Sequence, residues 1–259
     1  MVKWDGVTSR EINSLDKNLP VVLPLGSIEV HGPHLPLGTD TTIIYEVALK
    51  ASELEEALVL PPLAYCYAPE NKHFPGTISI SAVTLLRLIE EICSEISRNG
   101  FKKLIILNGH GGNRRILRLL MRDVLDKGLD IAIYSVTEPW SLIRDEIEKV
   151  RETSPVEHAC EIETSFMLYL NPEVTRLSYL EGKARTGTSF EKEGIETNAD
   201  WISYALEGYV GDPRKASEWK GKLLIEKWIE KTARIYKIVK EDRSVSEFLA
   251  HYRKASQVA

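Results

Sequence analysis

Short apolar runs alternate along the chain with longer stretches in which apolar residues recur at helical spacing. The runs typical of buried strands lie near Val21 and at 57–60, 104–107 and 131–134. The expected helices cover 41–51, 83–98, 116–126, the segment after Glu161, and 220–239. Strands that alternate with helices predict an α/β fold: a mostly parallel sheet with helices on both faces. At 259 residues, 43% of them hydrophobic, the chain suits a single domain spanning 1–259.

The loop behind the first apolar run carries the first candidate chemistry. Residues 23–40 read LPLGSIEVHGPHLPLGTD. Glu29 and His31 are two residues apart, so in an extended segment their side chains leave on the same side. Asp40 precedes the first expected helix, where it would also suit the N-cap. Carboxylates and imidazoles beyond a strand end are typical ligands of Zn, Mn or Fe. The alternative is a polar loop whose acids cap helices and whose histidines bond the backbone.

A second loop, NGHGGN at 108–113, directly follows the apolar run 104–107. In open α/β sheets, ligands bind beyond the carboxyl ends of the strands, so we expect His110 at the same rim as Glu29 and His31. The glycines permit close backbone approach, and the backbone of Gly111 is a candidate donor to a substrate oxygen. A phosphate cradle is the alternative. The loop lacks both a Lys-Ser/Thr pair and GxGxxG spacing, which disfavours that alternative.

A third cluster, VEHACEIETS at 156–165, contains one histidine and three glutamates. A helix through the whole segment would put His158 and Glu161 on one face, whereas an extended or broken start at 159–160 would let His158 and Glu163 converge. By itself the segment is typical of a solvated acidic helix start. A Cys160–His158 nucleophile is a further alternative, which the acidic surroundings disfavour because they raise a thiol pKa.

These motifs resemble those of the creatininase (creatinine amidohydrolase) family of metal-dependent C–N hydrolases over nearly the whole chain. The matching segments are LPLGSIEVHGPHLPLGTD, HFPGTISIS, NGHGGN, EHACEIETS, TGTSFEKEGIETNAD and GYVGDPRKAS. The resemblance implies a creatininase-like fold with the active site at the carboxyl ends of the strands, and a centre of two metals. It implies that Glu29 and His110 bind one metal, that His31 binds the other, and that Asp40 bridges both. It also implies that His158 carries protons during catalysis.

Two departures from the creatinine-specific enzymes bear on the metals and the substrate. Those enzymes carry Tyr-Glu after NGH, and that Glu completes the second metal site, whereas this chain has Gly111 and Gly112. Glu163 is the candidate replacement. They also carry Trp and Asp where this chain has Ser154 and Pro155, and a longer segment before HFPGT. Creatinine itself is therefore not the expected substrate. The NGHGGN variant resembles a broader branch with formamidopyrimidine-type deformylases and peptidases of cofactor maturation.

The predicted function is hydrolysis of a non-peptide or cyclic amide C–N bond in a small molecule by a metal-bound hydroxide. Two divalent ions (Zn, Mn or Fe) would activate the water, and His158 would carry a proton to the leaving nitrogen. We expect Trp140 and Glu157 to contact substrate, and Glu157 or Asn113 to partner the second nitrogen of a ligating imidazole. The hypothesis from another class is a non-catalytic metal- or ligand-binding protein with an incomplete second metal site.

Charge, hydrophobicity and cysteine content limit the kinds of partner and compartment that we expect. A net charge of −5 without a basic cluster argues against nucleic acid. No apolar run reaches membrane-spanning length and the start of the chain has no signal-peptide pattern, so we expect a cytoplasmic protein with no membrane partner. The three cysteines, Cys66, Cys93 and Cys160, are widely spaced, which suits a reducing compartment. The family resemblance implies a homo-oligomer, often a hexamer.

Overall fold

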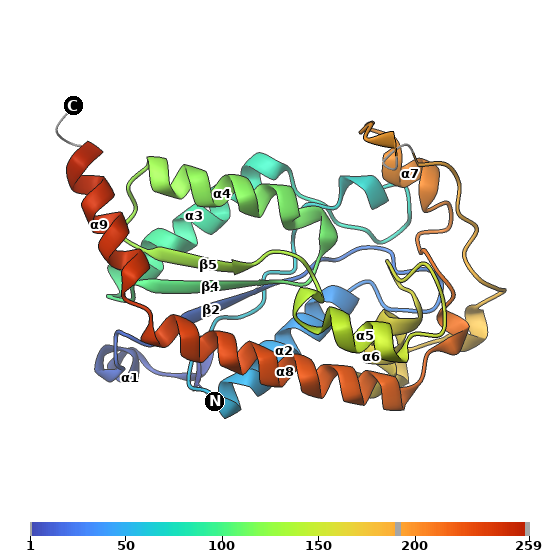
Figure 1. Ribbon diagram of the computed structural model, residues 1–259, viewed down its shortest axis with the longest axis horizontal. Helices are drawn as coiled ribbons and strands as arrows, with labels where there is room; N and C mark the ends of the chain where they lie inside the picture. The colour runs from blue at the N-terminus through green and yellow to red at the C-terminus, as the bar shows by residue number, and fades with distance from the viewer. Residues whose placement is uncertain (1, 190–192, 257–259) are drawn as a thin grey trace.

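The computed structural model describes residues 2–189 and 193–256 (Figure 1). Three residues of the TGTSFEKEGIETNAD motif, 190–192, lie outside that range. Within it, five parallel strands form one sheet in the order β1-β3-β2-β4-β5. The strands are β1 (Val2–Lys3), β2 (Val21–Leu25), β3 (Leu58–Val59), β4 (Lys103–Asn108) and β5 (Ala132–Val136). The prediction of a parallel sheet is confirmed, and β1 is an additional edge strand.

All five expected helices are present, and each begins or ends near the predicted bounds. They are α2 (Thr39–Leu54), α3 (Ala82–Arg98), α4 (Arg114–Asp126), α6 (Glu161–Leu170) and α8 (Glu218–Glu241). The structure adds α1 (Ser9–Ser14), α5 (Arg144–Val150), α7 (Asp200–Tyr204) and α9 (Ser244–Ser256). Two short 3-10 helices, η2 (Pro69–Asn71) and η3 (Gly111–Asn113), lie in loops that border the candidate site.

Helices cover both faces of the sheet (Figure 1). Helices α3 and α4 pack on one face, and α2, α6 and α8 pack on the other. Consecutive residues of a strand point to opposite faces, so Val21 and Leu104 join the α3–α4 cluster while Val22 and Ile105 join the α2–α6–α8 cluster. Burial on both sides explains why the strands read as continuous apolar runs rather than as alternating ones.

The strand register brings two polar loops to one edge of the sheet. Leu25, the last residue of β2, pairs with Asn108, the last residue of β4. The backbone N–H of Gly109 donates to the carbonyl of Leu25 at 2.8 Å. The segments that carry Glu29 and His110 therefore start side by side at the carboxyl edge. Among the helices in the described part of the chain, none is both long enough and apolar enough to cross a bilayer.

Candidate metal centre

Asp40 reaches the edge of the sheet because β2 ends at a glycine that touches α2. A Cβ on Gly26 would lie 2.5 Å from the Cα of Thr41, so only glycine permits this contact. The Thr41 hydroxyl donates to the carbonyl of Ser27 at 2.8 Å, and the Ser27 hydroxyl donates to Asp40 Oδ2 at 2.8 Å. The expected N-cap role of Asp40 is wrong. Gly38 is the N-cap residue, and Asp40 lies inside the first turn with its carboxylate turned to the centre.

The first group of candidate ligands consists of Glu29, Asp40 and His110, all of them buried. His110 Nδ1 lies 2.7 Å from Glu29 Oε1 and 3.1 Å from Asp40 Oδ2. The other ring nitrogen, Nε2, donates to the carbonyl of Tyr67 at 3.0 Å. That bond occupies the Nε2 proton, so Nδ1 is the nitrogen that faces the two carboxylates.

The second group consists of His31, Asp40 and Glu163, which are also buried. His31 Nε2 lies 3.2 Å from Asp40 Oδ1 and 3.8 Å from Glu163 Oε2. His31 Nδ1 donates to the carbonyl of Glu29 at 3.1 Å, so Nε2 is the nitrogen that faces the acids. Asp40 belongs to both groups and turns one carboxylate oxygen to each histidine.

The start of α6 decides which glutamate of the third motif joins the centre. The helix begins only at Glu161, and Ala159 before it has a left-handed backbone with φ of 48°. This turn lets the N–H of Ala159 donate to Glu163 Oε2 at 2.6 Å, and Glu163 faces His31. Glu161 turns away and pairs with Lys220 at 2.5 Å. Of the two arrangements that the sequence left open, the structure has the broken start, but it brings Glu163 to His31 rather than to His158.

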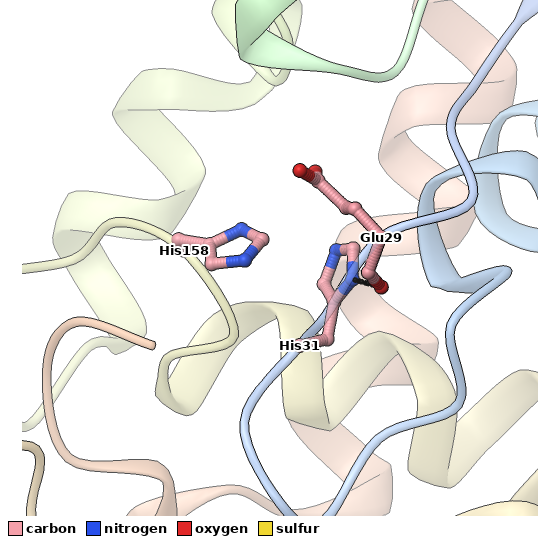
Figure 2. A group of neighbouring side chains, drawn as sticks. All are labelled: Glu29, His31 and His158. Atoms are coloured by element: carbon pink, nitrogen blue, oxygen red, sulfur yellow. Dashed lines mark hydrogen bonds between the residues drawn. The ribbon is translucent and has the colours of Figure 1, made fainter. Parts of the chain in front are cut away.

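A third group joins Glu29, His31 and His158, with one ligand atom of each within 4.8 Å of the others. Figure 2 shows that the His158 ring comes from the opposite side of the centre and faces the Glu29 carboxylate and the His31 ring. The two imidazoles are tilted by 45° with their centroids 4.3 Å apart. His158 Nε2 donates to the carbonyl of Val30 at 2.7 Å. His158 is partly exposed whereas Glu29 and His31 are buried, so it is the member of this group that solvent reaches.

The electrostatics of the centre favour a cation. Within residues 2–189 and 193–256, the ion-pair partners of Glu29, Asp40 and Glu163 are histidines and no lysine or arginine. Burial would lower the pKa of His31, but the Asp40 and Glu163 carboxylates raise it to about 10. Burial raises the pKa of Glu163 to about 8 despite the opposing effect of His31. A metal-free centre therefore holds protons where a divalent ion would supply the positive charge.

His158 behaves differently from the other histidines of the centre. Burial, and then the positive charge on His31, lowers the pKa of His158 to about 4. The ring is therefore neutral at neutral pH. Since Nε2 carries the proton that is donated to Val30, Nδ1 is the free acceptor.

The glycine loop packs closely against the centre at Gly112. A Cβ on Gly112 would lie 2.5 Å from both His110 Nε2 and the carbonyl oxygen of Tyr67, so no side chain fits there. A Cβ on Gly111 would make only ordinary van der Waals contact, with the guanidinium of Arg114 at 3.4 Å. Asn113 does not partner an imidazole. Its Oδ1 accepts from the N–H of Tyr67 at 3.3 Å and so holds the segment whose carbonyl binds His110.

The other two predicted substrate contacts, Trp140 and Glu157, have partners outside the three ligand groups. Trp140 packs edge-on against Phe166 of α6, with ring centroids 6.1 Å apart, and is half-buried. Glu157 accepts a hydrogen bond from the hydroxyl of Tyr204 at 3.5 Å. The expectation that Glu157 or Asn113 would partner a ligating imidazole is wrong, because backbone carbonyls fill that role for all three histidines. Side-chain partners are unnecessary where the loops themselves present carbonyls.

Sequence reasoning missed two residues that contact the centre, Asn71 and Trp201. Asn71 Nδ2 donates to Glu29 Oε2 at 2.6 Å, and Trp201 Nε1 donates to Asn71 Oδ1 at 2.9 Å. The Trp201 ring also stands edge-on to His158 at 5.6 Å. These contacts join segments 42 and 130 residues apart, so no local pattern could have indicated them.

A parallel α/β sheet with buried carboxylates and imidazoles at its carboxyl edge is the arrangement of a metal-dependent enzyme. The family model for creatininase, described as creatinine amidohydrolase, matches residues 5–236. The chain belongs to the creatininase family.

Individual relatives support this assignment. The chain is 27% identical over 223 residues to a creatinine amidohydrolase of Pseudomonas putida, covering 80% of this chain and 84% of that protein. It is 30% identical over 244 residues to a mycofactocin precursor peptide peptidase of Mycolicibacterium smegmatis. The match covers 92% of this chain and 91% of that protein. A solved manganese form of creatininase has the same fold, with a TM-score of 0.79 at 24% identity over 93% of this chain and 99% of that one.

Proposed function

We propose that this protein hydrolyses a non-peptide or cyclic amide C–N bond in a small molecule with the help of two divalent metal ions. The observation that carries the proposal is the position of Asp40. One of its carboxylate oxygens faces the first ligand group and the other faces the second. A carboxylate shared by both ligand groups would hold two ions side by side.

The donor set fits two ions. Glu29, Asp40 and His110 would hold one, and His31, Asp40 and Glu163 would hold the other. Glu163 thus takes the place of the glutamate that the Gly112 position cannot carry. Both imidazoles donate their N–H to backbone carbonyls and keep a lone pair for the centre. When bound, the ions would supply Lewis acidity and lower the pKa of water to near neutrality.

His158 is the proposed proton carrier. Its Nε2–H is held by the carbonyl of Val30, and its Nδ1 is free. Nδ1 would accept a proton from the attacking water and return it to the leaving nitrogen as the C–N bond breaks. Water is consumed in this step, and a carboxylic acid and an amine are formed. Proton acceptance requires a neutral ring, which the lowered pKa of His158 provides.

We place the substrate on the exposed side of His158. The backbone of Gly111 would donate to the carbonyl oxygen of the substrate, and Glu157 and Trp140 would contact its other end. Creatinine is not the substrate that we propose, because Ser154 and Pro155 replace the Trp and Asp expected of creatinine-specific enzymes.

The second candidate function is cleavage of a peptide during cofactor maturation. It is favoured by the 30% identity to the mycofactocin precursor peptide peptidase over 92% of the chain. Deformylation of a formamidopyrimidine is the third. A panel of formamides, lactams and short peptides separates them, because a peptidase should ignore formamides. A protein that binds metal but hydrolyses none of the three classes would support the non-catalytic hypothesis.

Metal content per subunit tests the central proposal directly. We expect about two equivalents of Zn, Mn or Fe in the native protein by elemental analysis, and loss of most of the metal in Asp40→Ala. Asp126→Ala, which removes an exposed carboxylate from the end of α4, is the matched control and should keep both equivalents. One equivalent or none in the native protein, or an Asp40→Ala variant that keeps its metal, would contradict the two-metal centre.

We further propose that the chain acts as one domain, in the cytoplasm and as a homo-oligomer. Both hydrophobic clusters pack on the same sheet, which supports a single domain. The three cysteines are free and buried, as in a reducing compartment. Large apolar side chains such as Tyr65, Ile78 and Tyr179 are exposed, which favours contact with further copies. Light scattering on the purified protein measures the oligomeric state.

A further inference from the structure

Asn71 is a buried amide that contacts the candidate metal centre without belonging to any ligand group. It ends η2, is only 2% exposed, and donates from Nδ2 to Glu29 Oε2 at 2.6 Å. The other oxygen of Glu29 faces His110 at 2.7 Å. Both oxygens of this carboxylate are therefore held in place, one by the amide and one within the first ligand group.

Trp201 fixes the orientation of that amide. Its indole N–H donates to Asn71 Oδ1 at 2.9 Å. A carboxylate only accepts hydrogen bonds and an indole N–H only donates, so a flipped amide would lose both bonds at once. The Trp201–Asn71–Glu29 chain therefore has a single consistent arrangement. It begins in α7, late in the sequence, and ends at a candidate metal ligand.

We propose that Asn71 and Trp201 are positioning residues that set the orientation of the Glu29 carboxylate and thereby the affinity of the first ligand group for its metal. This inference rests on the proposed two-metal function. Partners that orient a ligating side chain typically contribute about 10- to 100-fold in metal affinity. The N–H of Trp201 reaches Glu29 only through Asn71, so it contributes the smaller share.

Three variants test the chain of contacts. Asn71→Leu keeps a side chain of similar size but removes both hydrogen bonds. Trp201→Phe keeps an aromatic ring beside His158 and removes only the N–H donor. The double variant combines them, and Trp219→Phe, at an indole that is 57% exposed on α8, is the matched control.

The measurement is the dissociation constant for each of two equivalents of Zn²⁺, obtained by titrating chelator-stripped protein against a competing chelator. We expect one equivalent to bind about 10- to 100-fold more weakly in Asn71→Leu and about two- to tenfold more weakly in Trp201→Phe, with the other equivalent nearly unchanged. The double variant should be no weaker than Asn71→Leu alone, because both changes break the same chain. Trp219→Phe should match the native protein.

The outcomes separate this inference from the function on which it rests. If the native protein binds no Zn²⁺, both the two-metal function and the inference are overturned. If the native protein binds two equivalents and Asn71→Leu binds them equally well, only the positioning role is overturned. Fully additive losses in the double variant would also overturn it, because they would mean that Trp201 acts independently of Asn71. Circular dichroism of the stripped variants confirms that each is folded before it is titrated.

Discussion

At the scale of single residues, His158 can act in two ways. Its Nδ1 is free for a proton, yet His158 also lies in a ligand group with Glu29 and His31 (Figure 2). If it carries protons, His158→Gln should keep about two metal equivalents and lose about 10²- to 10⁴-fold in kcat toward the substrate that the panel identifies. Elemental analysis and steady-state kinetics on the same preparation measure both quantities.

The control for this prediction is His251→Gln, which changes an exposed histidine on α9 and should leave both quantities unchanged. Loss of a metal equivalent in His158→Gln would instead make His158 a ligand, and the proton carrier would have to be sought elsewhere.

The packing at Gly112 gives a second prediction at this scale. Gly112→Ala would place a methyl group 2.5 Å from His110 Nε2 and from the carbonyl oxygen of Tyr67. The required shifts should destabilise the protein by about 1–3 kcal/mol in denaturant unfolding of the metal-free chain. Gly182→Ala, at a position with no atom within 4 Å, should change the unfolding free energy by less than about 0.5 kcal/mol. Equal stability of the two variants would contradict the steric explanation for the glycine.

The identity of the ligand side chains was the most predictable feature of the centre. Ligand type and strand-end placement indicated Glu29, His31 and His110, and the structure brings them together at one edge. The role of Glu163 stayed open because it depends on the backbone of Ala159, and a positive φ at an alanine leaves no trace in hydrophobic periodicity. The N-cap expectation for Asp40 failed because its carboxylate bonds the Ser27 hydroxyl and the histidines instead of a helix N–H.

At the scale of elements, a buried ion pair fixes the segment that leads to His158. Lys220 of α8 is 1% exposed and bonds Glu161 of α6 at 2.5 Å. The Glu161 carboxylate also accepts from the N–H of Glu152 at 3.0 Å and of Thr153 at 2.8 Å. One side-chain pair thus ties α6, α8 and the loop before the third motif together. The loop could not reach this position without a partner for the buried charge.

We expect Lys220→Met to lower the free energy of unfolding by about 3–5 kcal/mol, because it leaves the Glu161 carboxylate buried without its cation. Urea unfolding followed by circular dichroism measures the change. Lys227→Met removes a lysine that is 45% exposed and paired with Glu230, and should cost less than about 1 kcal/mol. Similar losses of unfolding free energy in both variants would show that the buried Lys220–Glu161 pair stabilises the fold no more than an exposed pair does.

The elements themselves were predictable where they are long and periodic. Strands β2 and β4 and helices α3 and α8 match the expected runs because β2 and the four central residues of β4 are apolar and the helices keep one apolar face. Strand β1 has two residues, too few to show any period. The loop helices η2 and α7 are held by contacts such as Trp201–Asn71, which only the folded chain can form.

At the scale of the whole molecule, the metal centre joins loops that follow separate strands. Glu29 and His31 follow β2, His110 follows β4, Asp40 lies in the first turn of α2, and Glu163 lies in α6. Three buried carboxylates held together without a cation oppose folding unless protons neutralise them, as the raised pKa values of His31 and Glu163 indicate. Bound metal should therefore stabilise the entire sheet edge and not one loop.

This argument predicts the effect of metal on thermal unfolding. At free Zn²⁺ of about 100 times Kd, each site should add about 2.7 kcal/mol, so two sites should raise Tm by about 10–20 °C in a chain of this size. Differential scanning calorimetry at fixed protein concentration, with stripped and reloaded protein, measures the rise. Asp40→Ala should lose most of it because the shared carboxylate serves both ions, whereas Asp126→Ala should keep it. If Zn²⁺ raised the Tm of Asp40→Ala as much as that of the native protein, the stabilising metal would have to bind away from the sheet edge.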